Sequence, residues 1–277
     1  MTVFKLISAG ITACSGGLIM YSLNNYNLDY FKVNASWTTN FTPTSKWDSN
    51  WDRRDPSSVV KPPKGDDISA KFINELEQAK PTAKRHIFLI RHGQYNLDGK
   101  TDAERTLTKL GTEQAFLTGK RLQEFGHKYT HLIVSTMTRA KETAALIQES
   151  LPNNMKVVHC PFLEEGAPIP PEPPLGDYRP EPCQFFEDGA RIEAAFRRHI
   201  HRADPRQKED SYEIVVCHAN VIRYFICRAL QVPGEAWLRM SLHHASITAM
   251  TILPSGRVVL RTVSDSGHLP AQLVTSS

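Results

Sequence analysis

The chain has 277 residues, of which 40% are hydrophobic, 9% aromatic and 22% charged. This is the composition of an ordinary globular protein, and it excludes a wholly disordered chain and a fibrous repeat. The 33 basic and 29 acidic side chains give a net charge of +4, which is not the basic footprint of a nucleic-acid binder. Five cysteines without any CxxC pair argue against a disulfide framework or a cysteine zinc site, and favour a reducing compartment.

The N-terminus carries an apolar segment. Residues 6–23 (LISAGITACSGGLIMYSL) contain no charged side chain. Their length is close to the roughly 20 residues with which a helix crosses a bilayer. A signal peptide is the competing interpretation, but its apolar core is usually about 7 to 15 residues long. We therefore expect residues 1–24 to form a transmembrane anchor.

Residues 25–85 have a different character. Asn, Ser, Thr, Pro and Lys dominate and the apolar periodicity of a core is missing, so we expect a flexible tether. A short helix is predicted over 68–80, where apolar residues recur at helical spacing. The tether also contains WDSNWD at 47–52, and two exposed tryptophans would be unfavourable. Docking on the chain's own domain and docking on another subunit are both open.

Strands and helices alternate over residues 86–277. Buried strands are predicted at 86–90, 131–135, 156–160 and 212–217, and a β-hairpin at 246–264. Helices are predicted at 108–126, 138–150, 185–201 and 221–230. This order predicts an α/β domain in three layers, with a mostly parallel central sheet flanked by helices. Ligands of such sheets bind beyond the carboxyl ends of the strands.

Four of these strand ends carry candidate functional groups. They are Arg91 and His92, then Arg139, Glu165 and His218. Arginines give planar, charge-assisted hydrogen bonds to phosphate oxygens, so their meeting with two histidines and a carboxyl predicts a phosphate site. Taken singly, each residue has a structural explanation, such as a surface ion pair or a buried core histidine. Their joint occurrence at the strand ends favours the functional interpretation.

The residue types suggest a division of roles. His92 can attack phosphorus if its other ring nitrogen donates to a backbone carbonyl, and Gly93 allows the tight chain path that this needs. The neighbouring arginines disfavour a second positive charge and keep His92 neutral. Glu165 can protonate the leaving alcohol and then deprotonate the attacking water. His218 can donate to an equatorial phosphate oxygen. The other histidines show no metal-ligand pairing, so neither a metal nor a cofactor is predicted.

The order RHG, SxxxRAxxT, LxE and CHAxVIR resembles the histidine phosphatase superfamily, which includes the phosphoglycerate mutases, over residues 86 to about 265. WDSNWD and the run from EDGARIEAAF to FICRAL are similar to the mitochondrial serine/threonine-protein phosphatases of the phosphoglycerate mutase family. The resemblance implies a phosphohistidine mechanism with His92 as nucleophile. It places Arg91, Arg139 and His218 around the phosphate and makes Glu165 the acid.

The resemblance has further implications for partners and location. It implies an anchor in a mitochondrial membrane, with the outer membrane expected, and proteolytic release of the soluble part. It also implies homo-oligomers, dimers and higher, in which the motif docks on a neighbouring subunit and activates it. The residues concerned are Trp47, Asp48, Asn50, Trp51 and Asp52.

The leading hypothesis is a phosphatase of phosphoserine and phosphothreonine proteins, with phosphohistidine as a further candidate substrate. One alternative is an enzyme of small metabolites, either a phosphatase or a phosphoglycerate mutase, because the same pocket chemistry serves both. Another is a membrane-anchored scaffold that only binds phosphorylated partners. The presence of all five expected groups argues against the scaffold.

Overall fold

The computed structural model describes residues 45–63, 69–152 and 154–276. The expected anchor lies outside these residues. None of the helices in the described part of the chain is long and apolar enough to cross a membrane. The whole α/β domain lies within one compact unit, which spans residues 48–277.

A six-stranded sheet forms the centre of the domain, in the order β3-β2-β4-β1-β5-β6. Neighbouring strands from β3 to β1 pair in parallel, and β5 runs antiparallel to both β1 and β6. The predicted strands, the hairpin and the mostly parallel sheet are thereby confirmed. The strands are β1 (Arg85–Arg91), β2 (Tyr129–Ser135), β3 (Lys156–Cys160), β4 (Ser211–Cys217), β5 (Ile247–Ile252) and β6 (Val258–Asp265).

The helices follow the predicted pattern, but two of them start earlier, and the predicted helix 221–230 begins at Ala219. The predicted helix 185–201 begins earlier, at Pro182, because the fixed φ of proline suits the first helical position. The side chain of Thr108 caps α3 as expected, since its Oγ1 accepts from the Gly111 N–H at 3.0 Å. The helices are α1 (Pro56–Val59), α2 (Ala70–Gln78), α3 (Lys109–Glu124), α4 (Thr138–Glu149), α5 (Pro182–His199) and α6 (Ala219–Leu230). The described residues also form the 3-10 helices η1 (Asp102–Glu104), η2 (Pro161–Leu163), η3 (Gly234–Arg239) and η4 (Ala271–Leu273).

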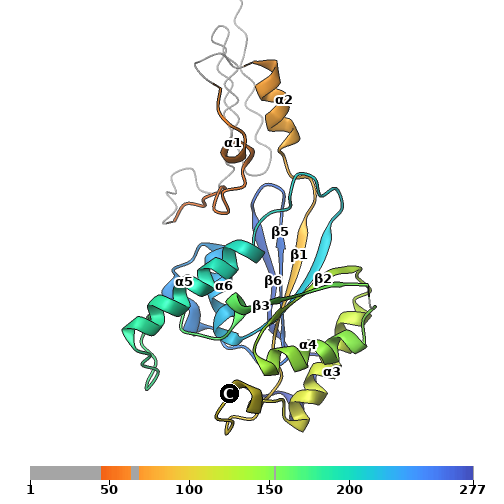
Figure 1. Cartoon of the computed structure of the whole chain (residues 1–277), viewed down its shortest axis with the longest axis vertical. Coiled ribbons are helices and arrows are strands. Elements are labelled where there is room, and N and C mark those ends of the chain that lie inside the picture. The colour runs from red at the N-terminus through yellow and green to blue at the C-terminus, as the bar shows by residue number, and fades with distance from the viewer. Residues whose placement is uncertain (1–44, 64–68, 153, 277) are drawn as a thin grey trace, which may run out of the picture. The chain divides into compact units, whose positions relative to one another are not determined.

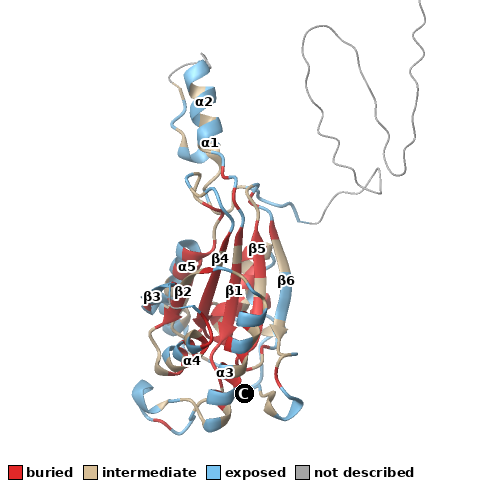
Figure 2. Cartoon of the chain, turned by 90° about the vertical axis from the view of Figure 1, so that its right-hand side faces the viewer, coloured by how far each residue is buried: buried red, intermediate tan, exposed pale blue. Residues whose placement is uncertain are grey.

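Helices cover both faces of the sheet (Figure 1). Side chains alternate along each strand, so Ile87 and Leu89 of β1 join the core beneath α5 and α6. Phe88 and Ile90 face the other way, into the core beneath α3 and α4. Figure 2 shows the central strands buried and β6 more exposed at its edge of the sheet. The domain therefore has three layers, with the sheet in the middle.

The segment from Asp48 onward packs on the domain of its own chain. The ring of Trp51 lies 5.6 Å from that of Phe196, between centroids, and its Nε1 donates to the Gly256 carbonyl at 2.7 Å. The side chain of Gln231 bonds both the N–H and the carbonyl of Asp48, each at 2.8 Å. Gly256 has a φ of +83°, and a Cβ there would lie 2.5 Å from a backbone oxygen of this segment. The hairpin turn thus needs a glycine to receive the motif.

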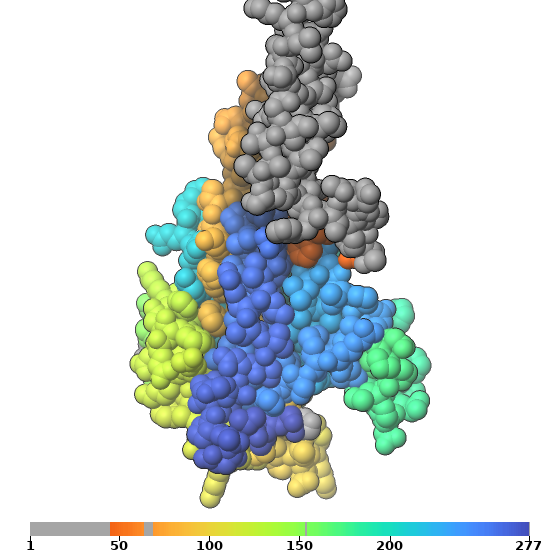
Figure 3. Space-filling model, turned by 180° about the vertical axis from the view of Figure 1, so that it is seen from behind, coloured from red at the N-terminus to blue at the C-terminus, as the bar shows by residue number. Residues whose placement is uncertain are grey.

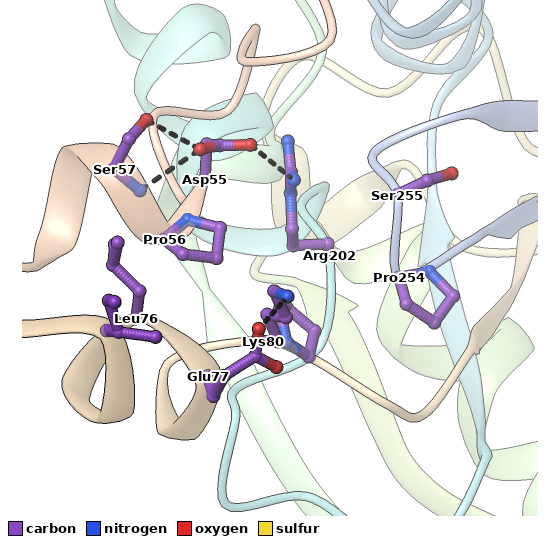
Figure 4. A pocket seen from close by; sticks show the side chains of 11 residues that line it. Asp55, Pro56, Ser57, Leu76, Glu77, Lys80, Arg202, Pro254 and Ser255 are labelled. Atoms are coloured by element: carbon purple, nitrogen blue, oxygen red, sulfur yellow. Dashed lines mark hydrogen bonds and ion pairs between the residues drawn. The ribbon is translucent and has the colours of Figure 1, made fainter. Parts of the chain in front are cut away.

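A buried ion pair fastens the same segment. Arg202 and Asp52 have side chains only 2% and 1% exposed, and Arg202 Nη2 lies 2.8 Å from Asp52 Oδ1. Burial alone would raise the pKa of Asp52, but the hydrogen bonds and charge of Arg202 outweigh it and lower the pKa. Figure 4 shows Arg202 also facing Asp55, which caps α1, in a cleft of about 520 Å³ beside α2.

Substitution Asp52→Asn should lower the free energy of unfolding by about 3 to 5 kcal/mol, because it removes the buried charge partner of Arg202 and leaves only Asp55, at 3.9 Å, to compensate that charge. Urea unfolding of the purified chain measures this. The matched control is Glu124→Gln, which removes the exposed pair with Arg121 and should change stability by less than about 1 kcal/mol. Equal effects of the two substitutions would show that the buried pair does not fasten the segment.

Candidate active site

The register of the sheet brings the two predicted histidines together. Arg91 at the end of β1 pairs with Cys217 at the end of β4, so the next residue of each strand is a histidine. The His92 N–H donates to the Cys217 carbonyl at 3.0 Å. The rings of His92 and His218 are 5.0 Å apart between centroids. The two histidines therefore lie together at the carboxyl edge of the parallel strands, which is the edge at which the sequence predicts the site.

His92 is held in one orientation and one protonation state. Its Nδ1 lies 2.8 Å from the Gly93 carbonyl, to which it donates, so Nε2 keeps its lone pair. Arg139 Nε donates to that Nε2 at 3.2 Å. Burial is the largest cause that lowers the pKa of His92 well below its usual value, and the nearby His218 ring and the charges of the two arginines disfavour the protonated form further. The arginines, to which the sequence analysis attributed the neutral state, are thus secondary to burial.

Gly93 and Thr143 fix the loop that carries His92. A Cβ at Gly93 would lie 2.5 Å from the Gly111 carbonyl oxygen, so only glycine fits this approach to α3. The Gly93 N–H donates to Thr143 Oγ1 at 3.0 Å, and this hydroxyl donates to the Arg139 carbonyl at 2.7 Å. The final threonine of SxxxRAxxT therefore ties the loop after β1 to α4.

Arg139 lies in the first turn of α4 and is only 3% exposed. Its Nη1 is 3.6 Å from Asp102 Oδ1, and its guanidinium lies over the Tyr95 ring at 4.6 Å. This ion pair with Asp102 does not lie on the surface, since it holds a buried guanidinium beside His92. Arg91 is also buried, and its Nη1 donates to the Leu242 carbonyl at 2.5 Å.

Glu165 lies in the wall of the cleft, after η2. Burial of its carboxyl raises the pKa of Glu165, although backbone N–H groups and the two arginines oppose the shift. The Gly166 and Asn220 N–H groups donate to its oxygens at 3.2 and 3.4 Å. A raised pKa favours the protonated carboxyl that an acid catalyst needs.

His218 is fully buried and is held by Ser135. Its Nε2 lies 2.8 Å from Ser135 Oγ, and its Nδ1 has no hydrogen-bond partner among the described residues. Burial, followed by the charge of Arg139, lowers the pKa of His218 well below its usual value, so the ring is neutral. If Ser135 donates to Nε2, the ring proton sits on Nδ1 and can be donated to a ligand.

A cleft of about 480 Å³ is lined by His92, the two arginines and Glu165, while His218 lies buried behind its wall. Several residues of this wall were not predicted from the sequence. Asn220 and Arg223 lie in the first turns of α6, directly after His218. Both belong to the CHANVIR motif, which could have identified them as residues of the site. Tyr95, Leu175, Leu238, Arg239, Met240 and Ser241 complete the wall from loops and η3 that carry no motif.

The described residues contain no cluster of three or more His, Cys, Asp or Glu side chains that could hold a metal ion. The lining of the cleft contains four guanidinium groups, from Arg91, Arg139, Arg223 and Arg239. It contains a single carboxyl group, that of Glu165, whose pKa is raised. Such an excess of fixed positive charge is suited to a tetrahedral anion such as a phosphoryl group.

Known proteins resemble the chain over 65% to 100% of its length. Serine/threonine-protein phosphatase Pgam5, mitochondrial, from Drosophila grimshawi is 50% identical, over 100% of this chain and 96% of the relative. The protein of the same description from Xenopus laevis is 56% identical, over 84% of each chain. The crystal structure of a candidate α-ribazole-5'-P phosphatase from Escherichia coli is 23% identical, with a TM-score of 0.51, and covers 65% of this chain and 97% of that one.

The model of the histidine phosphatase superfamily, branch 1, matches residues 87–167 and 174–265. These two ranges include the end of β1 with His92, the start of α4 with Arg139, Glu165 and His218. Together with the relatives of about 50% identity over the full length, the match shows that the chain belongs to the histidine phosphatase superfamily.

Proposed function

We propose that this chain is a protein serine/threonine phosphatase that works through a phosphohistidine intermediate on His92. The observation that carries the proposal is the lone pair of a buried, neutral His92, held 3.2 Å from the Arg139 Nε and walled by Glu165. The choice of phosphoprotein substrates is supported by the relatives, which are named serine/threonine-protein phosphatases. Phosphohistidine is a further candidate substrate.

In the first step, His92 Nε2 attacks phosphorus while the bond from phosphorus to the serine or threonine oxygen breaks. Glu165 gives its proton to that oxygen, which leaves as the alcohol. Arg91 and Arg139 bind the phosphoryl oxygens, and the neutral His218 donates from Nδ1. The hydrogen bond from Nδ1 of His92 to Gly93 stabilises the charge that develops on the ring.

In the second step, the Glu165 carboxylate takes a proton from a water molecule that attacks the phosphohistidine. The bond between Nε2 and phosphorus breaks, inorganic phosphate leaves, and His92 recovers its lone pair. Glu165 is protonated again, so one turnover returns every group to its starting state.

The location and domain organisation are part of the proposal. Residues 1–24 would anchor the chain in a mitochondrial membrane, the outer one, residues 25–85 would tether it, and residues 86–277 would form the catalytic domain. The 18 uncharged residues at 6–23 and the word "mitochondrial" in the relatives' names support this.

We also propose homo-oligomers, dimers and higher, assembled through residues 47–52. The support is that Asp48, Trp51 and Asp52 use specific partners on the domain, namely Gln231, Gly256 and Arg202. A second copy of the chain offers the same partners, so the motif can dock on a neighbour with identical chemistry.

The first test compares substrates. A phosphoserine or phosphothreonine peptide should have a kcat/KM at least about tenfold above that of phosphoglycerate, which corresponds to about 1.4 kcal/mol of transition-state binding. His92→Ala should abolish turnover of both substrates, and rapid quenching of the wild type should trap label on His92. A higher kcat/KM for phosphoglycerate would favour a metabolic enzyme, and label on another residue would refute the nucleophile.

The pH profile follows from the two pKa shifts. Activity needs neutral His92 and protonated Glu165. The pKa of His92 lies well below 6.5, so kcat/KM should fall only at pH values well below 6.5, as the ring gains its proton. The pKa of Glu165 lies above 4.5. On the alkaline side, kcat/KM should therefore decrease only at pH values above 4.5, as the carboxyl loses its proton.

Glu165→Gln is the matched variant for the alkaline limb. It cannot transfer a proton, so the variant should lose that limb while keeping the acid limb. Its defect in phosphoenzyme formation should be smaller with p-nitrophenyl phosphate, whose leaving group needs no acid, than with a phosphoserine peptide. An alkaline limb that persists in Glu165→Gln would assign it to another group.

Oligomerisation is tested by complementation. Trp51→Ala removes the aromatic contact and the hydrogen bond to Gly256, and should reduce both the particle mass in light scattering and the specific activity. Mixing this variant with His92→Ala should restore activity, because the catalytically dead chain can donate an intact motif to the other. If Trp51→Ala leaves the particle mass unchanged, or if the mixture stays inactive, the motif docks only on its own chain and the proposed exchange between subunits is wrong.

A further inference from the structure

Arg91 is oriented by the segment that precedes β5. Its Nη1 donates to the Leu242 carbonyl at 2.5 Å, and its Nη2 lies 3.0 Å from His244 Nε2. Both contacts are buried. They constrain two corners of the guanidinium, which is the group we expect to grip the phosphoryl oxygens.

The contact with Arg91 determines the tautomer of His244. A guanidinium only donates, so His244 Nε2 must accept, and the ring proton must be on Nδ1. Nδ1 lies 2.9 Å from Thr275 Oγ1, to which it therefore donates. Burial, and then the charge of Arg91, lowers the pKa of His244 to about 3, which agrees with a neutral ring.

Thr275 is itself held on several sides. Its carbonyl accepts from the His244 N–H at 2.9 Å, and its Oγ1 accepts from Gln114 Nε2 at 2.9 Å. Gln114 is fully buried in α3, and its Nε2 also donates to the Leu273 carbonyl at 2.6 Å. Its Oε1 accepts from the Gln94 N–H at 2.8 Å, in the loop after β1.

These bonds form one network from the C-terminal segment to the phosphate site. Figure 3 shows the C-terminal residues, in the darkest blue, at the end of the domain where the loop after β1 lies. We propose that His244 and Thr275 are positioning residues, which hold Arg91 in the orientation that binds phosphate. The inference rests on the proposed role of Arg91 and adds to it a dependence on the C-terminal segment.

The network should act on Arg91 selectively. Arg139 is held by other contacts, to Asp102, Tyr95 and His92. Loosening His244 should therefore weaken phosphate binding in the ground state and transition state alike. This raises KM and the inhibition constant of inorganic phosphate, while kcat changes little.

The first experiment alters the hydroxyl of Thr275 in the full chain. Thr275→Val keeps the shape of the side chain but loses both hydrogen bonds, and should raise KM and the inhibition constant of phosphate about three- to tenfold. Thr275→Ser keeps the hydroxyl and should restore wild-type values. Ser276→Val alters the exposed neighbouring residue and should have no effect.

The second experiment separates the two ring nitrogens of His244. His244→Gln can place an amide oxygen near the position of Nε2 and accept from Arg91, whereas His244→Asn can reach only Thr275. Phosphate affinity should therefore be higher in the glutamine variant than in the asparagine variant. Urea unfolding of both variants checks that affinity does not simply follow stability.

Arg91→Met, assayed with p-nitrophenyl phosphate, separates the proposed phosphate-binding role of Arg91 from the positioning role of His244 and Thr275. If it leaves phosphate inhibition unchanged, Arg91 is not a phosphate ligand, and the proposed role and this inference both fail. If it weakens phosphate binding but Thr275→Val does not, only the inference fails. Equal losses in Thr275→Val and Thr275→Ser, or phosphate affinity that merely tracks unfolding free energy, would also overturn it.

Discussion

A buried imidazole beside guanidinium groups stays buried only if it carries no charge, because desolvation and the neighbouring charges both penalise its protonated form. His92 is in this situation, and the Gly93 carbonyl determines which nitrogen keeps the one remaining proton. The other nitrogen then faces Arg139 with its lone pair available. The loop after β1 therefore sets the charge, the tautomer and the direction of the nucleophile together.

The same burial acts in opposite directions on the base and the acid. It penalises the charged form of each group, so it lowers the pKa of His92 and raises that of Glu165. Both shifts favour the states needed for the first step, a neutral nucleophile and a protonated acid. The arginines remain as fixed positive charges, and a phosphoryl group supplies the negative charge that balances them. The buried, positively charged cleft thus both favours an anionic ligand and sets the protonation states of His92 and Glu165.

Much of this arrangement could be predicted from the sequence. Buried parallel strands read as continuous apolar runs, and their carboxyl ends mark the site, which is how His92, Arg139 and His218 were found. The strand order was not predicted, since it depends on pairing between distant segments. The contacts of His244 were also missed, because its partners Arg91 and Thr275 lie 153 and 31 residues away and form no local pattern.

The motif around Trp51 poses a separate thermodynamic question. Trp51 donates to the Gly256 carbonyl and Asp52 pairs with Arg202, and both contacts are formed within one chain. A neighbouring copy would provide the same partners, so exchanging the motif between copies gains no new contact energy there. Docking within the chain also has the advantage of a high effective concentration. Exchange between subunits can therefore prevail only if the copies gain further contacts outside the motif, so a stable oligomer must have an additional interface beyond residues 47–52.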